Sequence, residues 1–254
     1  MPPKKPADSL GDYPRPSVAV DVALLTVRRG ELQVLLVRRP EGDEAGRFAL
    51  PGRFLRPHQT LVDAVHDCLQ EKVGIRGRAP RQLHVFDEPG RDSRGWVLSV
   101  AHVDVVPYAE LEPVLSPGDR ELRPVDDFLS AELHEPLPYD HEQIIGFAAA
   151  AVRAEYAANP DPAGLLESEF TMSELRAVHE AVAGSRLQRD TFRRLMEPQL
   201  VATDKRVAPL GSESLLSLQG DPAMRSDLRS AGSGRGRPAQ VYRRREQPLR
   251  MRAI

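Results

Sequence analysis

The sequence predicts an α/β domain followed by a small helix-turn-helix domain. Residues 17–27 and 32–39 are two apolar runs rich in β-branched residues, which is typical of paired strands. Residues 60–72 carry apolar side chains at helical spacing. Two short helical segments lie within residues 171–198. Strands mixed with helices favour a sheet covered by helices, and the later helix pair favours a separate unit.

Two strand pairs and one long helix are expected in the first domain. Arg29-Gly30-Glu31 is a hairpin signal between the first two strands. Residues 83–86 and 96–105 predict a second pair joined by a loop. A helix at 140–158 is expected to close the domain.

The second domain is predicted from two helices and a tight turn. Thr171 and Glu174 have the spacing of a capping box, and apolar residues continue at helical spacing to Gly184, where the helix ends. Residues 188–198 form a second amphipathic segment that a proline ends. In a helix-turn-helix protein this second helix enters the DNA major groove. Helix pairs of this length also occur in small bundles, and the pair alone leaves both interpretations open.

Strands at residues 200–201 and 240–242 are expected to form a wing around a long loop, residues 205–236. The loop is rich in Ser and Gly, so its middle is expected to be mobile, with a short helix near residues 224–228. Gly236-Arg237-Pro238 gives a rigid cationic turn suited to a phosphate.

The net charge of −2 conceals an asymmetry between the two halves. Residues 165–254 hold 16 Lys and Arg against 11 Asp and Glu, a net +5, which leaves −7 for residues 1–164. Arginines crowd the last stretch, as expected for a surface that binds a polyanion. A solubilising tail is the alternative for such a terminal charge run.

Composition limits the class of protein. The chain has 254 residues, 41% of them hydrophobic, which is enough for two modest cores. Its start, residues 1–16, is rich in Pro and charge and predicts a disordered tail rather than a signal peptide. One cysteine, Cys68, excludes an intrachain disulfide framework and a Cys-based zinc site. A cytoplasmic location is the default expectation.

The segment Pro51–Ile75 carries the most specific pattern. Its spacing, fixed by Val73-Gly74-Ile75, resembles the Nudix box, Gly-x5-Glu-x7-Arg-Glu-U-x-Glu-Glu-x-Gly-U, in which U is apolar. Glu71 is the one carboxylate of four that remains. The other ionic positions hold Arg53 for Gly, Gln59 for Glu, Asp67 for Arg, Cys68 for Glu and Lys72 for Glu.

Loss of these carboxylates bears on metal binding. Mg²⁺ needs several oxygen ligands, and pyrophosphate hydrolysis relies on it. On a continuous helix, Cys68, Glu71 and Lys72 would share the face where the metal sits, and the Lys72 ammonium would repel a metal ion. An ordinary amphipathic helix ending at Gly74 is the alternative interpretation.

Five motifs in order resemble the Nudix-related transcriptional regulators of NAD metabolism, the NrtR type. They are LPGRF at 50–54, EPGRDSRGWVLSVAHVDVVP at 88–107, LPYDHEQII at 137–145, FTMSELRAVHEAV at 170–182 and GRPAQVYR at 236–243. The resemblance implies a Nudix α/β/α sandwich at residues 17–158 and a small winged helix-turn-helix domain at residues 165–245, with a basic tail at residues 246–254.

The resemblance also implies a function and a set of residues. We expect a dimeric repressor, not an enzyme, that binds a pseudo-palindromic operator and senses ADP-ribose or a related nucleotide without metal or cofactor. The expected ligand-binding residues are Arg38, Arg47, Arg53, Glu71, Lys72, Arg91 and Arg94. The expected DNA-binding residues are Arg189, Thr191, Arg193, Arg194, Arg235, Arg237 and Arg243.

Three alternatives stay open at this point. Turn chemistry alone would leave Arg91 and Arg94 solvated in a hairpin loop. A Nudix hydrolase acting on ADP-ribose or a nucleotide sugar would use Glu71, Asp67 and Asp63. A regulator with the same two domains could sense a sugar instead.

Overall fold

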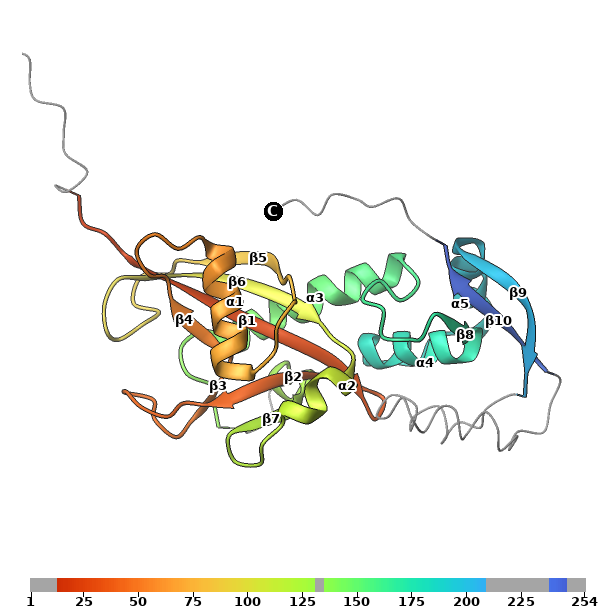
Figure 1. The fold of residues 1–254 in the computed structure, drawn as a ribbon, viewed down its shortest axis with the longest axis horizontal. Coiled ribbons are helices and arrows are strands. Elements are labelled where there is room, and N and C mark those ends of the chain that lie inside the picture. The colour runs from red at the N-terminus through yellow and green to blue at the C-terminus, as the bar shows by residue number, and fades with distance from the viewer. Residues whose placement is uncertain (1–12, 131–134, 209–237, 246–254) are drawn as a thin grey trace, which may run out of the picture.

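The computed structural model describes residues 13–130, 135–208 and 238–245. A larger α/β part and a smaller part lie end to end along the longest axis of the molecule (Figure 1). Four expected segments lie outside the described residues: residues 1–12 of the N-terminal tail, the middle of the wing loop with its short helix, Gly236-Arg237 and the basic tail.

A seven-stranded mixed sheet forms the first part. Its order is β3-β2-β1-β6-β5, with β4 paired to β1 and β7 to β2. The expected hairpin between β1 and β2 is confirmed, and Arg29 and Gly30 turn the chain with φ of 52° and 83°. The strands are β1 (Ser17–Arg28), β2 (Glu31–Arg38), β3 (Phe48–Ala49), β4 (Gly52–Phe54), β5 (Arg81–Phe86), β6 (Val97–Val105) and β7 (Arg120–Pro124).

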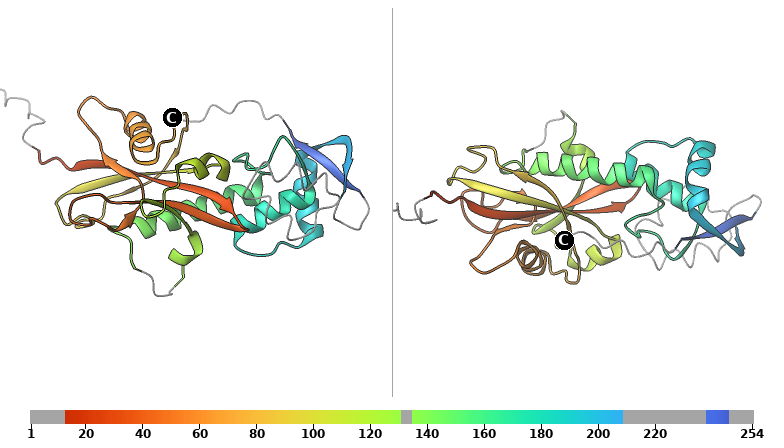
Figure 2. Two further views of the ribbon diagram at one scale, coloured as in Figure 1. Left: turned by 60° about the horizontal axis from the view of Figure 1, so that its bottom comes forward. Right: turned by 90° about the horizontal axis from the view of Figure 1, so that it is seen from above.

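Helices cover both faces of this sheet (Figure 2). Alternate residues of β1 and β2 therefore enter two separate apolar clusters, one under α1 and one under α3. This arrangement confirms the expected α/β/α sandwich, and α3 matches the helix expected at 140–158. The helical segments are α1 (Leu61–Cys68), η2 (Leu69–Val73), α2 (Tyr108–Leu111), η3 (Glu112–Val114), η4 (Val125–Phe128) and α3 (His141–Ala158).

The helix expected at residues 60–72 is not uniform. A Thr60–Asp63 capping box starts α1, which ends at Cys68, and the π-helical turn η2 continues to Val73. A π turn adds a residue to the repeat, so side chains beyond it rotate to new positions. Glu71 and Lys72 are therefore turned away from Cys68, which ends the buried face of α1 and lies in the core, where burial raises the pKa of its thiol to about 12. The expected common face of Cys68 with Glu71 and Lys72 is wrong for Cys68.

The smaller part is a winged helix. The capping box at Thr171–Glu174 and the left-handed Gly184 after the first helix are as expected. The wing strands are longer than expected, since β9 continues past Lys205, and β8 was not expected at all. The elements are β8 (Glu169–Thr171), α4 (Met172–Ala183), α5 (Arg189–Met196), η5 (Glu197–Gln199), β9 (Leu200–Val207) and β10 (Ala239–Arg244), with sheet order β8-β10-β9.

One hydrophobic cluster joins the two parts. It runs from Leu25 and Val27 of β1 through Val152 and Tyr156 of α3 to residues of α4, α5 and β10, such as Phe192. Helix α4 also contacts the β1–β2 hairpin. No helix of the described chain is long and apolar enough to cross a membrane. Because the core is continuous, a change in packing in one part alters the packing in the other.

Candidate functional site

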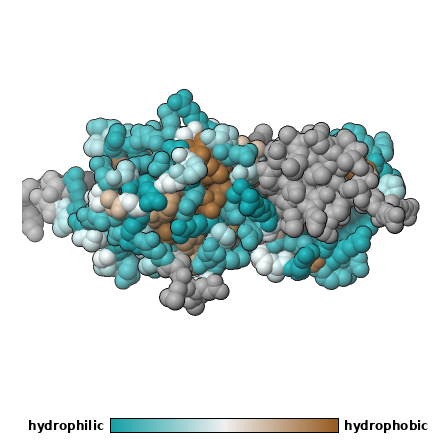
Figure 3. Space-filling model, turned by 90° about the horizontal axis from the view of Figure 1, so that it is seen from below, coloured by the Kyte–Doolittle hydropathy of each residue, from teal (hydrophilic) through white to brown (hydrophobic). Residues whose placement is uncertain are grey.

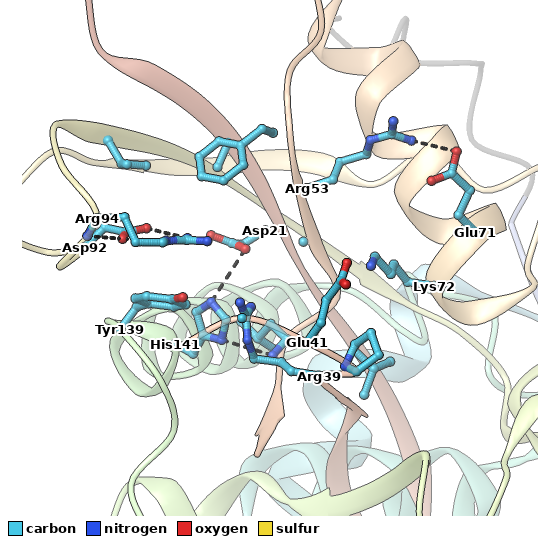
Figure 4. Close-up of a pocket in the computed structure, with 18 of the residues that line it drawn as sticks. Asp21, Arg39, Glu41, Arg53, Glu71, Lys72, Asp92, Arg94, Tyr139 and His141 are labelled. Carbon is cyan, nitrogen blue, oxygen red and sulfur yellow. Dashed lines mark hydrogen bonds and ion pairs between the residues drawn. The ribbon is translucent and has the colours of Figure 1, made fainter. Parts of the chain in front are cut away.

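A cavity of about 670 Å³, lined by many charged residues, opens on the α/β part, between β1, β4, η2 and the start of α3. Figure 4 shows Arg53, Glu71 and Lys72 on one side of it and Arg94, Asp92, Tyr139 and His141 on the other. Six of the seven expected ligand residues line it, namely Arg38, Arg53, Glu71, Lys72, Arg91 and Arg94.

Arg53 lies against the acidic residues of the degenerate box. Its Nη1 is 3.1 Å from Glu71 Oε1 and 3.2 Å from Asp67 Oδ2, and its side chain is 7% exposed. Gln59 Nε2 donates to the same Asp67 oxygen at 2.7 Å. A guanidinium thus neutralises both carboxylates, including Glu71, the one signature carboxylate that remains in the box.

These residues do not fit a divalent metal. Hard cations need several oxygen ligands in one place. The described residues contain no group of three or more His, Cys, Asp or Glu that could hold a metal ion. Arg53 already pairs with Glu71 and Asp67, and the Lys72 side chain lines the same wall.

Arg91 is buried at the floor of the cavity rather than solvated in its loop. Its Nε donates to Asp140 at 2.7 Å, a second guanidinium nitrogen pairs with the same carboxylate, and its side chain is 5% exposed. Burial would lower the Arg91 pKa, but Asp140 and Asp21 raise it. The alternative of a solvated Arg91 is therefore wrong.

Asp21 links this ion pair to His141. Its Oδ2 accepts from Ser99 Oγ at 2.5 Å, and its Oδ1 lies 3.5 Å from His141 Nε2. Burial alone would raise the Asp21 pKa, but His141, Ser99 and Arg91 together hold it below the ordinary value. Gly52 makes room for this carboxylate, because a Cβ there would lie 2.0 Å from Asp21 Oδ1.

Arg94 forms an aromatic edge of the cavity with two rings. Its guanidinium pairs with both oxygens of Asp92 and lies 5.2 Å from the ring centres of Phe54 and Tyr139. The Tyr139 hydroxyl is buried and has no hydrogen-bond partner among the described residues. A planar group could stack on this edge.

Arg38 and Arg47 are occupied elsewhere. Arg38 borders the cavity, but its guanidinium donates to the backbone oxygens of Gly46, at 2.6 Å, and Gly118. Arg47 lies outside the cavity, where it pairs with Glu44 and donates to Pro136 O. Neither is free in this arrangement.

Sequence reasoning missed several cavity residues. A signal for Asp21 was available, since it is the one charge within an otherwise apolar strand run. His141 and Asp140 lie in the quoted LPYDHEQII motif, but the motif gives no sign that they meet β1. The missed residues are Asp21, Arg39, Asp92, Tyr139, Asp140 and His141.

The winged helix exposes a second basic surface. Arg189, Thr191 and Arg194 are exposed on α5, while Phe192 and Met196 anchor its other side in the core. Within the described part of the chain, no acidic side chain pairs with Arg189 or Arg194. Arg193 is exposed but pairs with Glu197 through two bonds, at 2.8 and 2.9 Å.

The wing carries the remaining expected DNA residues. Arg243 is exposed on β10. Its neighbour Arg244 turns inward and bonds Asp161 and Leu166 O, which fixes β10 to the segment between the two parts. Arg235 and Arg237 lie outside the described residues.

The fold and the two surfaces define a class of protein, a Nudix-type α/β/α sandwich joined to a winged helix. The family model described as the NrtR DNA-binding winged helix domain matches residues 162–209. The "ADPR responsive transcriptional repressor NtrR" of Acinetobacter baylyi is 29% identical over 189 residues, which cover 73% of this chain and 74% of that relative.

Two further relatives cover about half and most of the chain. The "ADP-ribose pyrophosphatase" of Methanocaldococcus jannaschii is 32% identical over 139 residues, 52% of this chain and 73% of that protein. The crystal structure of Shewanella oneidensis NrtR with a 27mer DNA is 27% identical, covers 90% of this chain and 93% of its own, and superposes with a TM-score of 0.66. The chain belongs to the Nudix-related transcriptional regulators of the NrtR type.

Proposed function

We propose that this protein is a DNA-binding transcriptional repressor whose Nudix-type domain binds ADP-ribose or a related nucleotide as its effector. One observation carries the proposal: a single chain joins a cationic cavity without a metal cage to a winged helix whose second helix exposes unpaired arginines. The named relatives, a repressor responsive to ADP-ribose and a protein crystallised on DNA, support the same pairing.

The cavity suits a pyrophosphate linked to a base and sugars. Its volume of about 670 Å³ lies in the usual range of small-molecule sites, about 300–1,000 Å³. Arg91 and Lys72 supply donors for phosphate oxygens, and the edge formed by Arg94, Phe54 and Tyr139 accepts a planar base. Arg53 supplies the positive charge that a metal would otherwise bring to the Glu71 wall.

The exposed side of α5 suits the major groove. Arg189 and Arg194 can pair with guanine edges or with phosphates, and Thr191 lies between them. We assign Arg193 and Arg243 to phosphates, together with Arg235 and Arg237.

Several further features belong to the same proposal. The domain limits are residues 17–158 and 165–245, and the protein is cytoplasmic because its operator is there. It is a homodimer on a pseudo-palindromic operator, as two winged helices on a two-fold axis require. Apolar side chains gather near the middle of one face of the α/β part (Figure 3), and monomers rarely expose large apolar areas.

A hydrolase remains the second candidate because Glu71 and Asp67 keep carboxylates beside the cavity and the Methanocaldococcus relative is named a pyrophosphatase. It predicts metal-dependent release of AMP and ribose phosphate from ADP-ribose, abolished by Glu71→Gln. Our proposal expects no release with Mg²⁺ or Mn²⁺ and ADP-ribose binding that EDTA leaves unchanged. Turnover in either metal would favour the hydrolase.

DNA binding is tested by fluorescence anisotropy at several salt concentrations, on a duplex selected from a random library with the wild-type chain. We expect Arg189→Ala with Arg194→Ala to weaken binding at least tenfold and to reduce the salt slope by about 2, since each lost phosphate contact removes about 0.9. The matched control is Arg15→Ala with Arg76→Ala, which removes the same charge from exposed sites outside the winged helix.

A ligand titration on the same duplex identifies the effector. ADP-ribose, NAD and a pentose are each added to the protein–DNA complex, and ADP-ribose is expected to change the affinity most. In the DNA-binding test, affinity that does not depend on salt would contradict the proposal. An equal loss of affinity in the Arg189/Arg194 and Arg15/Arg76 double variants would also contradict it. A response to the pentose alone would point to a sugar sensor.

A further inference from the structure

We infer that helix α3 couples the effector cavity to α5. The Arg91–Asp140 ion pair at the N-terminal end of α3 is the contact that the effector's pyrophosphate displaces. This inference rests on the proposed function and names how its site is regulated. With 18 residues, α3 spans about 27 Å at 1.5 Å per residue. One helix therefore reaches from the cavity to the winged helix.

The N-terminal end of α3 borders the cavity. Asp140 is its N-cap residue, yet its side chain makes no capping bond because Arg91 holds the carboxylate. His141, the first helical residue, accepts from Leu50 N at 3.1 Å through Nδ1 and faces Asp21 through Nε2. A ligand at Arg91 thus acts directly on the residue that starts the helix.

The residue before this end is strained. Tyr139 lines the cavity with φ of 59°, a left-handed conformation that costs a non-glycine residue about 1–2 kcal/mol. Its hydroxyl is buried without a partner among the described residues. Both features lower the stability of the present arrangement, so a ligand that bonds the hydroxyl or lets the backbone relax favours a different one.

Phosphate and Asp140 compete for the same guanidinium. A bidentate Arg–phosphate contact has the geometry of the Arg–carboxylate contact it replaces. Once released, the Asp140 carboxylate can accept from a backbone N–H group in the first turn of α3, as aspartate does at helix N-caps. The start of α3 then has two alternative sets of bonds, which a two-state element requires.

The second end of α3 supports α4 and α5. Arg153 Nε donates to Val182 O near the end of α4 at 2.9 Å, and a second nitrogen pairs with Asp126 at 2.6 Å. Tyr156 packs edge-on against His179 of α4, which packs edge-on against Phe192 of α5, with ring centres 5.1 and 5.0 Å apart. Any shift of α3 reaches α5 through two aromatic contacts.

Packing at this second end leaves room for such a shift. A mainly apolar cavity of about 240 Å³ lies between α3, α4 and α5, bordered by Arg153, Tyr156, Val182, Phe192 and Leu195. A close-packed contact between these helices would resist a change in the angle between α3 and α5. The cavity gives α5 space to adopt a second orientation. On a two-fold dimer, a small rotation of each α5 changes the spacing of both in the DNA.

The test measures coupling in the full chain as the ratio of DNA dissociation constants with and without saturating ADP-ribose. Wild type is expected to give a ratio of about 5–150, the usual range of allosteric coupling. Asp140→Asn, which loses the charge but keeps the shape, and Arg153→Gln, at the other end, are each expected to give less than about threefold. Calorimetry and anisotropy in single-ligand titrations measure the ADP-ribose and DNA affinities of each variant, so that the ratio is taken at saturating effector. Arg153→Gln, which lies outside the effector cavity, is expected to keep both affinities near those of wild type.

Asp104→Asn is the matched control. Asp104 accepts from Arg78 Nε at a distance of 2.8 Å, and this Arg–Asp pair does not border the cavity or α3. It should keep the wild-type ratio. Wild-type coupling in both Asp140→Asn and Arg153→Gln would overturn the inference, as would wild-type protein that binds both ligands without any coupling. Wild-type protein that binds neither would refute the proposed function itself.

Discussion

The arginines of the cavity and those of α5 bear the same charge in opposite settings. In the cavity, Arg53 and Arg91 are 7% and 5% exposed and each is fixed by carboxylates. On α5, Arg189 and Arg194 are exposed and have no acidic partner in the described part of the chain. A buried cation must have its partner in place before the ligand arrives, while a solvated one acts through its field at a distance.

The two settings separate stability from binding. Removing Arg91 leaves the buried carboxylates of Asp140 and Asp21 without their arginine, so the fold itself is weakened. Removing an exposed arginine changes the affinity for a polyanion and leaves the fold nearly unchanged.

The largest effect is expected from Arg91→Ala. Asp140 and Asp21 would lose their buried partner, which costs about 3–5 kcal/mol when one member of a buried pair is removed. Urea unfolding at pH 7 measures the free energy of unfolding, with Arg189→Ala as the exposed control, expected within about 0.5 kcal/mol of wild type. Equal losses in the two variants would erase the distinction.

A smaller effect is expected from His179 at the joint of α3, α4 and α5. Burial lowers its pKa to about 4 from an ordinary 6.5. The unfolded state therefore takes up the proton first, and the stability that this histidine gives is complete above pH 6.5 and is lost as the pH falls to 4. The loss is about 3 kcal/mol, because each tenfold difference in proton affinity between the folded and unfolded states corresponds to about 1.36 kcal/mol.

Unfolding curves of wild type and His179→Gln between pH 4 and 7 test this. The difference in free energy of unfolding between them should shrink as the pH falls. A constant difference would mean that His179 is not neutral when buried.

Gly52→Ala comes next. Its methyl group would lie 2.0 Å from Asp21 Oδ1 and 3.1 Å from Val20 O, so Asp21 must leave Ser99 and His141. Overpacking of this kind costs about 1–3 kcal/mol. ADP-ribose affinity by calorimetry should fall with the stability, whereas DNA affinity without effector should stay within about threefold.

Arg193→Ala should show the smallest effect. Its charge is offset by Glu197, and exposed i,i+4 pairs contribute about 0.3–0.5 kcal/mol. We expect a smaller loss of DNA affinity than for Arg194→Ala, by anisotropy in the same salt. The reverse order would show that DNA separates Arg193 from Glu197.

The sequence predicted the first hairpin and the start of α4 because local signals specify them. The hairpin at Arg29–Gly30 and the capping box at Thr171–Glu174 depend on neighbouring residues alone. The third strand of the wing, β8, has three residues and is held by pairing with β10, which lies about 70 positions later. No local pattern reveals such a strand.

The same limit applies to the cavity. Arg53 was identified because it stands at a fixed position of the box, but its pairing with Asp67 and Glu71 depends on how β4, α1 and the π turn at Leu69–Val73 come together. Asp21, Tyr139 and His141 meet only when β1 and the start of α3 come together. Spacing along the chain carries no information about that meeting.

The guanidinium of Arg53 has a consequence for how such a receptor would report. A bound magnesium ion exchanges with the cell, and its occupancy follows the free ion concentration and any competing chelator. A covalently attached arginine is always present, at a fixed stoichiometry of one. A sensor built in this way would read the concentration of its nucleotide alone, whatever the ionic state of the cell.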